Sequence, residues 1–174
     1  LEKQVLSKWK GESDQVIPLD VEGANILYVA LAGAHSIIPT ASILNAAREN
    51  WTLSFFEAVN FGAFVGDPIK TQIIAKRIIH EAIRLKVKEV VICECGTAFR
   101  VMKHLVGEQP FKVSHIAEVM ARYLKEGRMR VEKDRIKGLV TYHDPCQSAR
   151  NSGVIEEPRY VLNQLTSHFT EMTP

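Results

Sequence analysis

The chain has 174 residues, of which 46% are hydrophobic and 24% are charged, and its formal net charge is +2. This balance is typical of a globular chain rather than a disordered one, and the length allows one well-cored domain or two small half-domains. The small net charge, with basic residues spread along the chain, argues against a nucleic-acid partner. No apolar run approaches the roughly 20 residues of a membrane span, and residues 1–4 do not open a signal segment. Three cysteines without disulfide-framework spacing fit a reducing compartment.

The first third of the chain alternates helical and strand-like patterns. Residues 1–10 have the apolar spacing of a helix, whereas residues 25–31 form a continuous apolar run, typical of a strand buried on both faces. Pro39 suits the first turn of a helix that runs through Ala47, and a short strand is predicted at 51–54.

The remainder continues this alternation. The predicted helices span residues 69–85, 97–105, 116–124 and 158–169, and the predicted strands span 89–93 and 138–142. Alternating strands and helices predict an α/β fold, with a mainly parallel sheet flanked by helices. We expect the strands at about 26–32, 89–93 and 138–142 to be neighbours in that one sheet.

A weak internal repeat links the two ends of the chain. Residues 26–45 and 139–163 both have the pattern of a strand, a loop and a helix. Each helix contains a proline followed by a short motif, Ile43-Leu44-Asn45 in the first and Val161-Leu162-Asn163 in the second. The repeat predicts one full unit over residues 1–137 and the opening of a second unit over residues 138–174.

Two cysteines lie at the end of the strand predicted at 89–93. In extended geometry Cys93 and Cys95 point to the same face, and Gly96 permits a sharp turn out of the strand. Strand ends are where open α/β sheets bind ligands. Cys93 is either a small buried hydrophobe or a ligand, whereas Cys95 lies beyond the apolar run and is the better ligand candidate.

The third cysteine, Cys146, ends the stretch His143-Asp144-Pro145-Cys146. A helix that begins after Cys146, as after Cys95, would supply free N–H groups that lower the pKa of the thiol. A thiolate is the form that metals and nucleophilic mechanisms both require. Asp144 and Pro145 are equally typical of an ordinary turn.

Two kinds of site compete for these thiols. A cysteine hydrolase would require His35 or His115 to approach Cys146 through the fold. A zinc site could recruit the three cysteines and a histidine, but the chain has no Cys-x-x-Cys pair. An iron–sulfur cluster requires several thiolates, and three are few.

Six short stretches resemble a single family. They are 51–54 (WTLS), 57–67 (EAVNFGAFVGD), 94–96 (ECG), 142–146 (YHDPC), 149–151 (ARN) and 157–159 (EPR). The chain resembles the K-type iron–sulfur subunit of the membrane complex associated with dissimilatory sulfite reductase, also known as the heterodisulfide-reductase-like menaquinol oxidoreductase iron–sulfur subunit. It is more broadly similar to the cysteine-rich CCG domains of the heterodisulfide reductase B-type subunits and the glycolate oxidase iron–sulfur subunits.

The resemblance implies a degenerate first CCG unit. The place of its lone cysteine falls near residues 32–33, its Cys-Cys-Gly place reads Asn60-Phe61-Gly62, and its last motif keeps only Cys95. Cys146 matches the first cysteine of a second unit, whose other cysteines the resemblance places beyond the last residue. Thr97 stands where the family has histidine, so no role of that histidine is carried over.

The resemblance also implies a function. We expect part of an electron-transfer oxidoreductase subunit that reduces or forms a disulfide at a special [4Fe–4S] cluster. Cys95 and Cys146 would be the catalytic and cluster-binding thiols, facing a common cleft, with His143, Asp144 and Arg150 around them. These three would hydrogen-bond the cluster or dock an anionic partner, although a surface ion pair would equally explain Arg150. We expect no intact cluster and no activity in these 174 residues alone.

The implied partners are a membrane-bound, quinone-reactive cytochrome b-type subunit and a small disulfide-carrying protein or thiol substrate. The expected location is the cytoplasm, peripheral on the cytoplasmic face of the membrane, with no transmembrane segment in this chain. The alternative function is a non-catalytic scaffold or interaction half-domain in which Cys146 is inert. A cysteine hydrolase or a zinc protein is the third hypothesis.

Overall fold

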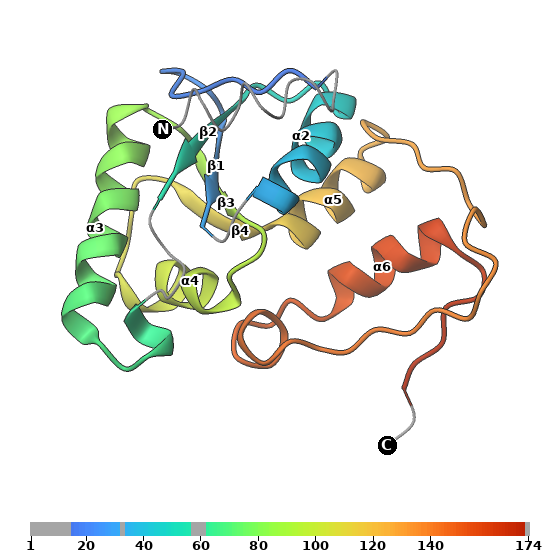
Figure 1. The fold of residues 1–174 in the computed structure, drawn as a ribbon. Helices are drawn as coiled ribbons and strands as arrows, with labels where there is room; N and C mark the ends of the chain where they lie inside the picture. Colours follow the sequence, from blue (N-terminus) through green and yellow to red (C-terminus); the bar gives the residue numbers. More distant parts are fainter. Residues whose placement is uncertain (1–14, 32–33, 57–61, 173–174) are drawn as a thin grey trace.

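A sheet of four parallel strands lies at the centre of the computed structural model, which describes residues 15–31, 34–56 and 62–172 (Figure 1). The strands are β1 (Ile26–Ala30), β2 (Trp51–Phe55), β3 (Glu89–Ile92) and β4 (Lys112–His115), in the order β2-β1-β3-β4. All three neighbouring pairs are parallel. The predicted α/β fold with a parallel sheet is therefore confirmed.

Helices cover the sheet on both faces (Figure 1). They are α2 (Ile37–Ala46) and α5 (Ile116–Lys125) on one face, and α3 (Pro68–Arg84) and α4 (Gly96–Arg100) on the other, whereas α6 (Glu156–Leu165) packs against α5 away from the sheet. Short turns complete the fold: the 3-10 turns η1 (Ala34–Ser36) and η2 (Gly62–Phe64), and the π-helical turns η3 (Val101–Leu105) and η4 (Cys146–Arg150).

The core has two halves, one on each side of the sheet. On one side Leu27, Val29 and Ile92 pack with apolar residues of α3 and α4. On the other side Tyr28 and Val91 pack with apolar residues of α2 and α5. Because side chains alternate along a strand and both faces are covered, β1 and β3 are buried throughout. The continuous apolar runs in the sequence have this physical origin.

The helix α3 begins where the backbone makes a close turn. Asp67 caps it by accepting a hydrogen bond from the Lys70 N–H at 2.9 Å, and Pro68 occupies the first turn. Gly62 lies directly under this turn, where a Cβ atom would come within 2.5 Å of the Thr71 nitrogen and 2.6 Å of the Asp67 oxygen. Only glycine fits there without a backbone shift.

One predicted strand does not join the sheet. Residues 138–142 form no strand of the sheet, and their one bridge pairs Val140 with Phe169, away from the four strands. The prediction that 138–142 neighbours β1 and β3 is therefore wrong. The position beside β3 is taken by β4, which the sequence analysis missed. The division of the chain at residues 137 and 138 stays a prediction.

The helix predictions differ from the structure mainly at their ends. The helix expected from Pro39 begins at Ile37, and the helix expected at 158–169 spans Glu156–Leu165. The pattern at 97–105 is helical but changes from α to π geometry at Val101. The helix predicted at 1–10 lies outside the described residues. In the part of the chain that the structure describes, no helix has the length and apolarity to cross a bilayer.

Candidate functional site

The strand order reverses between β1 and β3, which are parallel neighbours in the sheet. From β1 the chain passes to β2 on one side and then returns to β3 on the other. Ligands of open α/β sheets bind where the order reverses in this way. The loops that border this point begin at Leu31 after β1 and at Cys93 after β3, so the cysteine-bearing loop lies at the expected place.

A carboxylate ties these two loops together. Glu94 accepts hydrogen bonds from the Leu31 N–H at 3.0 Å and from the Tyr28 hydroxyl at 3.3 Å. The Tyr28 hydroxyl also lies 2.8 Å from the Ser36 hydroxyl, and burial, with Glu94 nearby, raises the pKa of Tyr28. Tyr28 and Ser36 were not predicted from the sequence, because the hydrogen bond from Tyr28 to Glu94 joins residues 66 apart in the chain.

Cys95 is the N-terminal cap of α4. Its backbone is extended, and its Sγ accepts a hydrogen bond from the Ala98 N–H at 3.4 Å. Burial raises the pKa of the Cys95 thiol, although the N–H groups of Ala98 and Thr97 act in the opposite direction. The expectation of a lowered pKa at Cys95 is therefore wrong, because desolvation outweighs the two donors.

Cys93 and Cys95 do not point to the same face. Cys93 packs against the core half that contains α2 and α5, whereas Cys95 packs against the half that contains α3 and α4. The prediction of a shared face is wrong because the strand ends at Ile92 and the chain has already turned at Cys95. Burial raises the pKa of the Cys93 thiol, which is hydrogen-bonded to Thr40. Cys93 thus has the surroundings of a core residue.

Cys146 opens a π-helical turn. The thiol-bearing residue is exposed, whereas Ser148 and Ala149 are buried and anchor the turn. Backbone hydrogen bonds close it, from the Ala149 N–H to the Pro145 oxygen and from the Asn151 N–H to the Cys146 oxygen, both at 3.0 Å. π-helical turns are rare and frequently occur at functional sites.

The two thiol-bearing loops meet through the residues that follow each cysteine. A Cβ atom on Gly96 would lie 3.0 Å from the Gln147 Cβ and 3.4 Å from the Ser148 nitrogen. Arg100 of α4 also donates to the Gln147 side-chain oxygen at 3.2 Å. The absence of a side chain at position 96 thus lets η4 approach α4 closely. The common cleft of Cys95 and Cys146 stays a prediction, and this contact supports it.

Replacing Gly96 with valine tests that contact. The branched side chain must push Gln147 and Ser148 away, since the space holds no Cβ without movement. We expect a short bifunctional thiol reagent to join Cys95 to Cys146 in the Cys93→Ser background, and Gly96→Val to lower the yield at least about tenfold. Peptide mapping by mass spectrometry measures the yield.

The matched control for this experiment is Gly138→Val, because nothing lies within 4 Å of a Cβ built at that glycine. It should leave the crosslinking yield unchanged. If both thiols react readily with monofunctional reagents but never crosslink in the unmodified chain, the two cysteines share no cleft.

The other predicted residues around Cys146 differ in their surroundings. His143 and Arg150 are exposed. Asp144 is held by Arg159 of α6, whose guanidinium donates to both carboxylate oxygens at 2.8 and 2.9 Å. This pair holds the pKa of the Asp144 carboxyl below its usual range. The sequence analysis quoted Arg159 within the stretch 157–159 but gave it no role.

The geometry gives no support to a cysteine hydrolase. The Nδ1 atom of His115 accepts from the Ala117 N–H at 3.3 Å, and the ring also hydrogen-bonds the Cys93 backbone. Burial lowers the pKa of His115, and its ring lies edge-on to Phe99 with centroids 5.3 Å apart. Both ring nitrogens therefore serve the structure, and His115 is not placed to deprotonate Cys146. His35, the other histidine considered, is exposed.

The described residues do not complete the ligand set of an iron–sulfur cluster. Within the described ranges no group of three His, Cys, Asp or Glu side chains could hold a metal ion. Cys93 and Cys95 pack against different halves of the core. Cys95 and Cys146 offer two thiolates, whereas a four-iron cluster requires four ligands.

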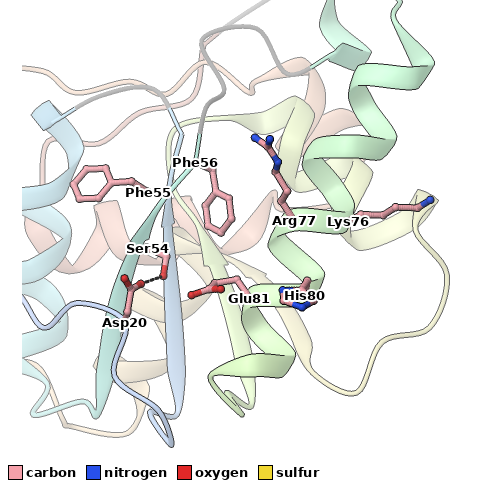
Figure 2. A pocket seen from close by; sticks show the side chains of 8 residues that line it. All are labelled: Asp20, Ser54, Phe55, Phe56, Lys76, Arg77, His80 and Glu81. Atoms are coloured by element: carbon pink, nitrogen blue, oxygen red, sulfur yellow. Dashed lines mark hydrogen bonds between the residues drawn. The ribbon is translucent and has the colours of Figure 1, made fainter. Parts of the chain in front are cut away.

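A cavity of about 540 Å³ lies elsewhere, between the end of β2 and α3 (Figure 2). Figure 2 shows Phe56 and Glu81 facing it, with Asp20 accepting a hydrogen bond from the Ser54 hydroxyl at 2.6 Å. Its carboxylates are already partnered, because Glu81 pairs with Arg84. No cysteine lines the cavity, so it is separate from the candidate site.

Comparison with known proteins identifies relatives of this chain. It is 41% identical over 98 residues to the D-type subunit of the dihydromethanophenazine:CoB–CoM heterodisulfide reductase of Methanosarcina mazei, covering 53% of this chain and 24% of that protein. It is 26% identical over 204 residues to the Hdr-like menaquinol oxidoreductase iron–sulfur subunit 2 of Archaeoglobus fulgidus, covering 88% of this chain and 37% of that protein. The corresponding protein of Archaeoglobus profundus is 26% identical over 200 residues, with 86% and 36% covered. No protein-family model and no solved structure matches the chain.

The chain therefore spans between about a quarter and about a third of the length of these relatives. These relatives are of two named kinds, heterodisulfide reductase subunits and Hdr-like iron–sulfur subunits. Both agree with the resemblance seen in the sequence, while the narrower link to a sulfite reductase complex stays a prediction. The chain is similar to heterodisulfide-reductase-like iron–sulfur subunits.

Proposed function

We propose that this chain is part of an iron–sulfur subunit that transfers electrons in a quinone-linked oxidoreductase. The observation that carries the proposal is the close contact of Gly96 with Gln147 and Ser148, because it gathers the Cys95 and Cys146 loops at one place. The names of the relatives, heterodisulfide reductase and menaquinol oxidoreductase iron–sulfur subunits, support the reaction class.

The finer proposal is disulfide chemistry at this place. Reduction of a disulfide takes up two electrons and two protons and yields two thiols, and oxidation is the reverse. A [4Fe–4S] cluster would supply the electrons one at a time. Cys146 is proposed as one ligand of the cluster, with other cysteines supplied from outside these 174 residues. Cys95, less exposed and at a helix start, is proposed as a second ligand or as the thiol that exchanges with the substrate.

The surface beside Cys146 suits an anionic partner. Arg150 and His143 are exposed on the same loop as the thiol, and a guanidinium can meet a carboxylate with paired N–H groups. We propose that they dock the acidic tail of a small disulfide-carrying protein or thiol substrate. A membrane-bound cytochrome b-type subunit is the proposed quinone-linked partner, which places the chain peripherally on the cytoplasmic face of the membrane.

One observation favours a second function. Cys146 is exposed, and the described residues hold no set of three metal-ligating side chains. A non-catalytic scaffold or interaction half-domain would have the same features, with Cys146 inert. The two proposals differ in whether Cys146 is needed for iron binding.

Iron and acid-labile sulfide analysis separates them. We expect a protein of the relatives' length that contains this chain to bind about four iron atoms more per molecule than its Cys146→Ser variant. The 174 residues alone should retain less than a full cluster after reconstitution. Cys93→Ser is the matched control and should keep all the iron, since Cys93 packs into the core. Unchanged iron and sulfide in Cys146→Ser would favour the scaffold.

A further inference from the structure

Arg159 joins three separate segments of the chain. Its guanidinium donates to both oxygens of Asp144 at 2.8 and 2.9 Å, and to both oxygens of Glu171 at 2.7 and 3.1 Å. Its Nη1 atom also donates to the Ile155 backbone oxygen at 2.8 Å. The Arg159 side chain is only 19% exposed, so these bonds are partly shielded from water.

The geometry is one that only arginine provides. A planar guanidinium can meet one carboxylate with a pair of parallel N–H groups and a second carboxylate along its other edge, whereas a lysine ammonium acts as a point charge. The ring of Tyr142 lies 6.0 Å from the guanidinium carbon, close enough for a cation–π contact. Arg159 thus contacts two residues of the stretch that leads to Cys146.

That stretch has few other anchors. Val140 is fixed by its bridge to Phe169, with the Val140 N–H donating to the His168 oxygen at 3.0 Å. At the other end the Pro145 oxygen accepts from η4. Between them, within the described ranges, the Asp144 carboxylate is the side chain that fixes residues 141–145 by hydrogen bonds. The position of the Cys146 loop therefore depends on what holds Asp144.

Arg159 also couples this loop to a second segment. Glu171 lies two residues after Phe169, which pairs with Val140. The bridge at Val140 and the two ion pairs of Arg159 therefore hold residues 140–146 and 169–171 side by side over α6. These three connections all act on the segment that leads to Cys146 or on the segment paired with it.

We infer that Arg159 is a positioning residue, which holds the Cys146 loop in place through Asp144 so that η4 keeps its contact with α4. The inference rests on the proposed function only for the role of Cys146. The Arg159 clamp, meaning its ion pairs with Asp144 and Glu171, is a property of these 174 residues. It assigns Asp144 to fixing the loop rather than to hydrogen-bonding a cluster.

Hydrogen exchange of the 174-residue chain tests the clamp without any cofactor. Arg159→Gln should reduce the protection of the Ala149 and Asn151 amides, which close η4, by at least about tenfold. The amides of Val29 and Ile92 in the sheet should keep their protection. Arg159→Lys should recover part of the lost protection, since it keeps one charge contact but not the paired geometry.

Two further variants show that the effect passes through Asp144. Asp144→Asn should lower the protection of the same amides, and the double variant with Arg159→Gln should lose little more than either single change, because both break one interaction. Arg84→Gln is the matched control, as Arg84 forms a similar paired bond with Glu81 on the distant helix α3. It should leave η4 unchanged.

The positioning role has its own readout in thiol crosslinking. In the Cys93→Ser background, Arg159→Gln should lower the yield of Cys95–Cys146 crosslinks while monofunctional labelling of Cys146 stays fast, and Arg159→Lys should restore part of the yield. Unchanged protection of η4 in Arg159→Gln would overturn the inference, and so would an equal loss of protection in the sheet. Iron retention in Cys146→Ser would instead contradict the proposed function alone.

Discussion

Replacing Arg122 with methionine is expected to lower the free energy of unfolding by about 3 kcal/mol at neutral pH. Arg122 of α5 donates to both oxygens of Glu89 at 3.0 and 2.7 Å, and the Glu89 side chain is only 12% exposed. Without Arg122, Glu89 becomes a largely buried carboxylate whose remaining cationic neighbour, Lys112, lies 3.7 Å away. Urea unfolding monitored by circular dichroism measures the loss.

The loss should depend on pH with a definite sign. Burial works against ionised Glu89, but Arg122 holds its pKa below the ordinary value of 4.5. In the native chain the pair therefore stabilises the fold fully above about pH 4.5, and this contribution is lost as the pH falls through the lowered pKa. In Arg122→Met the hydrogen bonds of Arg122 no longer oppose burial, so the pKa of Glu89 should rise, and the deficit should shrink as the pH falls and Glu89 becomes neutral.

Two controls make this prediction specific. Arg135→Met removes a comparable charge from an exposed pair with Glu132 and should leave stability unchanged. The double variant Glu89→Gln, Arg122→Met replaces the unpaired carboxylate with a neutral amide and should be more stable than Arg122→Met. A deficit of equal size at pH 4 and pH 7 would contradict the electrostatic explanation.

Phe99→Ala is expected to lower the free energy of unfolding by about 3–5 kcal/mol. Phe99 belongs to α4, and its side chain is completely buried. Its ring lies edge-on to His115, and the Lys103 Nζ atom lies over the ring, 4.9 Å from the centroid. Its removal leaves a cavity between α4 and the sheet. Because Cys95 caps α4, we also expect faster alkylation of Cys95 in this variant.

The matched control keeps an apolar side chain in the same space. Phe99→Leu should cost less than about half as much, since most of the buried volume is retained. Cys95 alkylation in Phe99→Leu should stay close to that of the native chain. Equal labelling rates in all three proteins would mean that α4 does not control access to Cys95.

The sequence predicts those parts of the sheet that are buried on both sides. The strands β1 and β3 are continuous apolar runs, and both were predicted within two residues of their ends. β4 was missed because Val113 is the one apolar residue of its Lys-Val-Ser-His stretch. β4 is a strand because it pairs with β3, and a local sequence pattern carries no information about that pairing.

The site was predicted in part. The rule that ligands gather at strand ends points to the loop after β3, where Cys95 lies, whereas η4, which begins at Cys146, reaches Gly96 without being preceded by a strand of the sheet. The meeting of Gly96 with Gln147 joins segments about 50 residues apart, and no spacing rule predicts it. Arg159 was missed for the same reason, because its partners lie before and after it in the chain.

The central position of β1 has a consequence for biosynthesis. One edge of β1 can pair with β2 soon after synthesis, but the partner for its other edge, β3, follows about 60 residues later. At about 5–20 residues per second this takes about 3 to 12 seconds. During that interval the ribosome-bound chain carries an apolar strand with an open edge, a template for pairing with other chains. Chaperone binding to residues 26–30 during translation would protect the strand that later pairs with β3 beside the loop of Cys93 and Cys95.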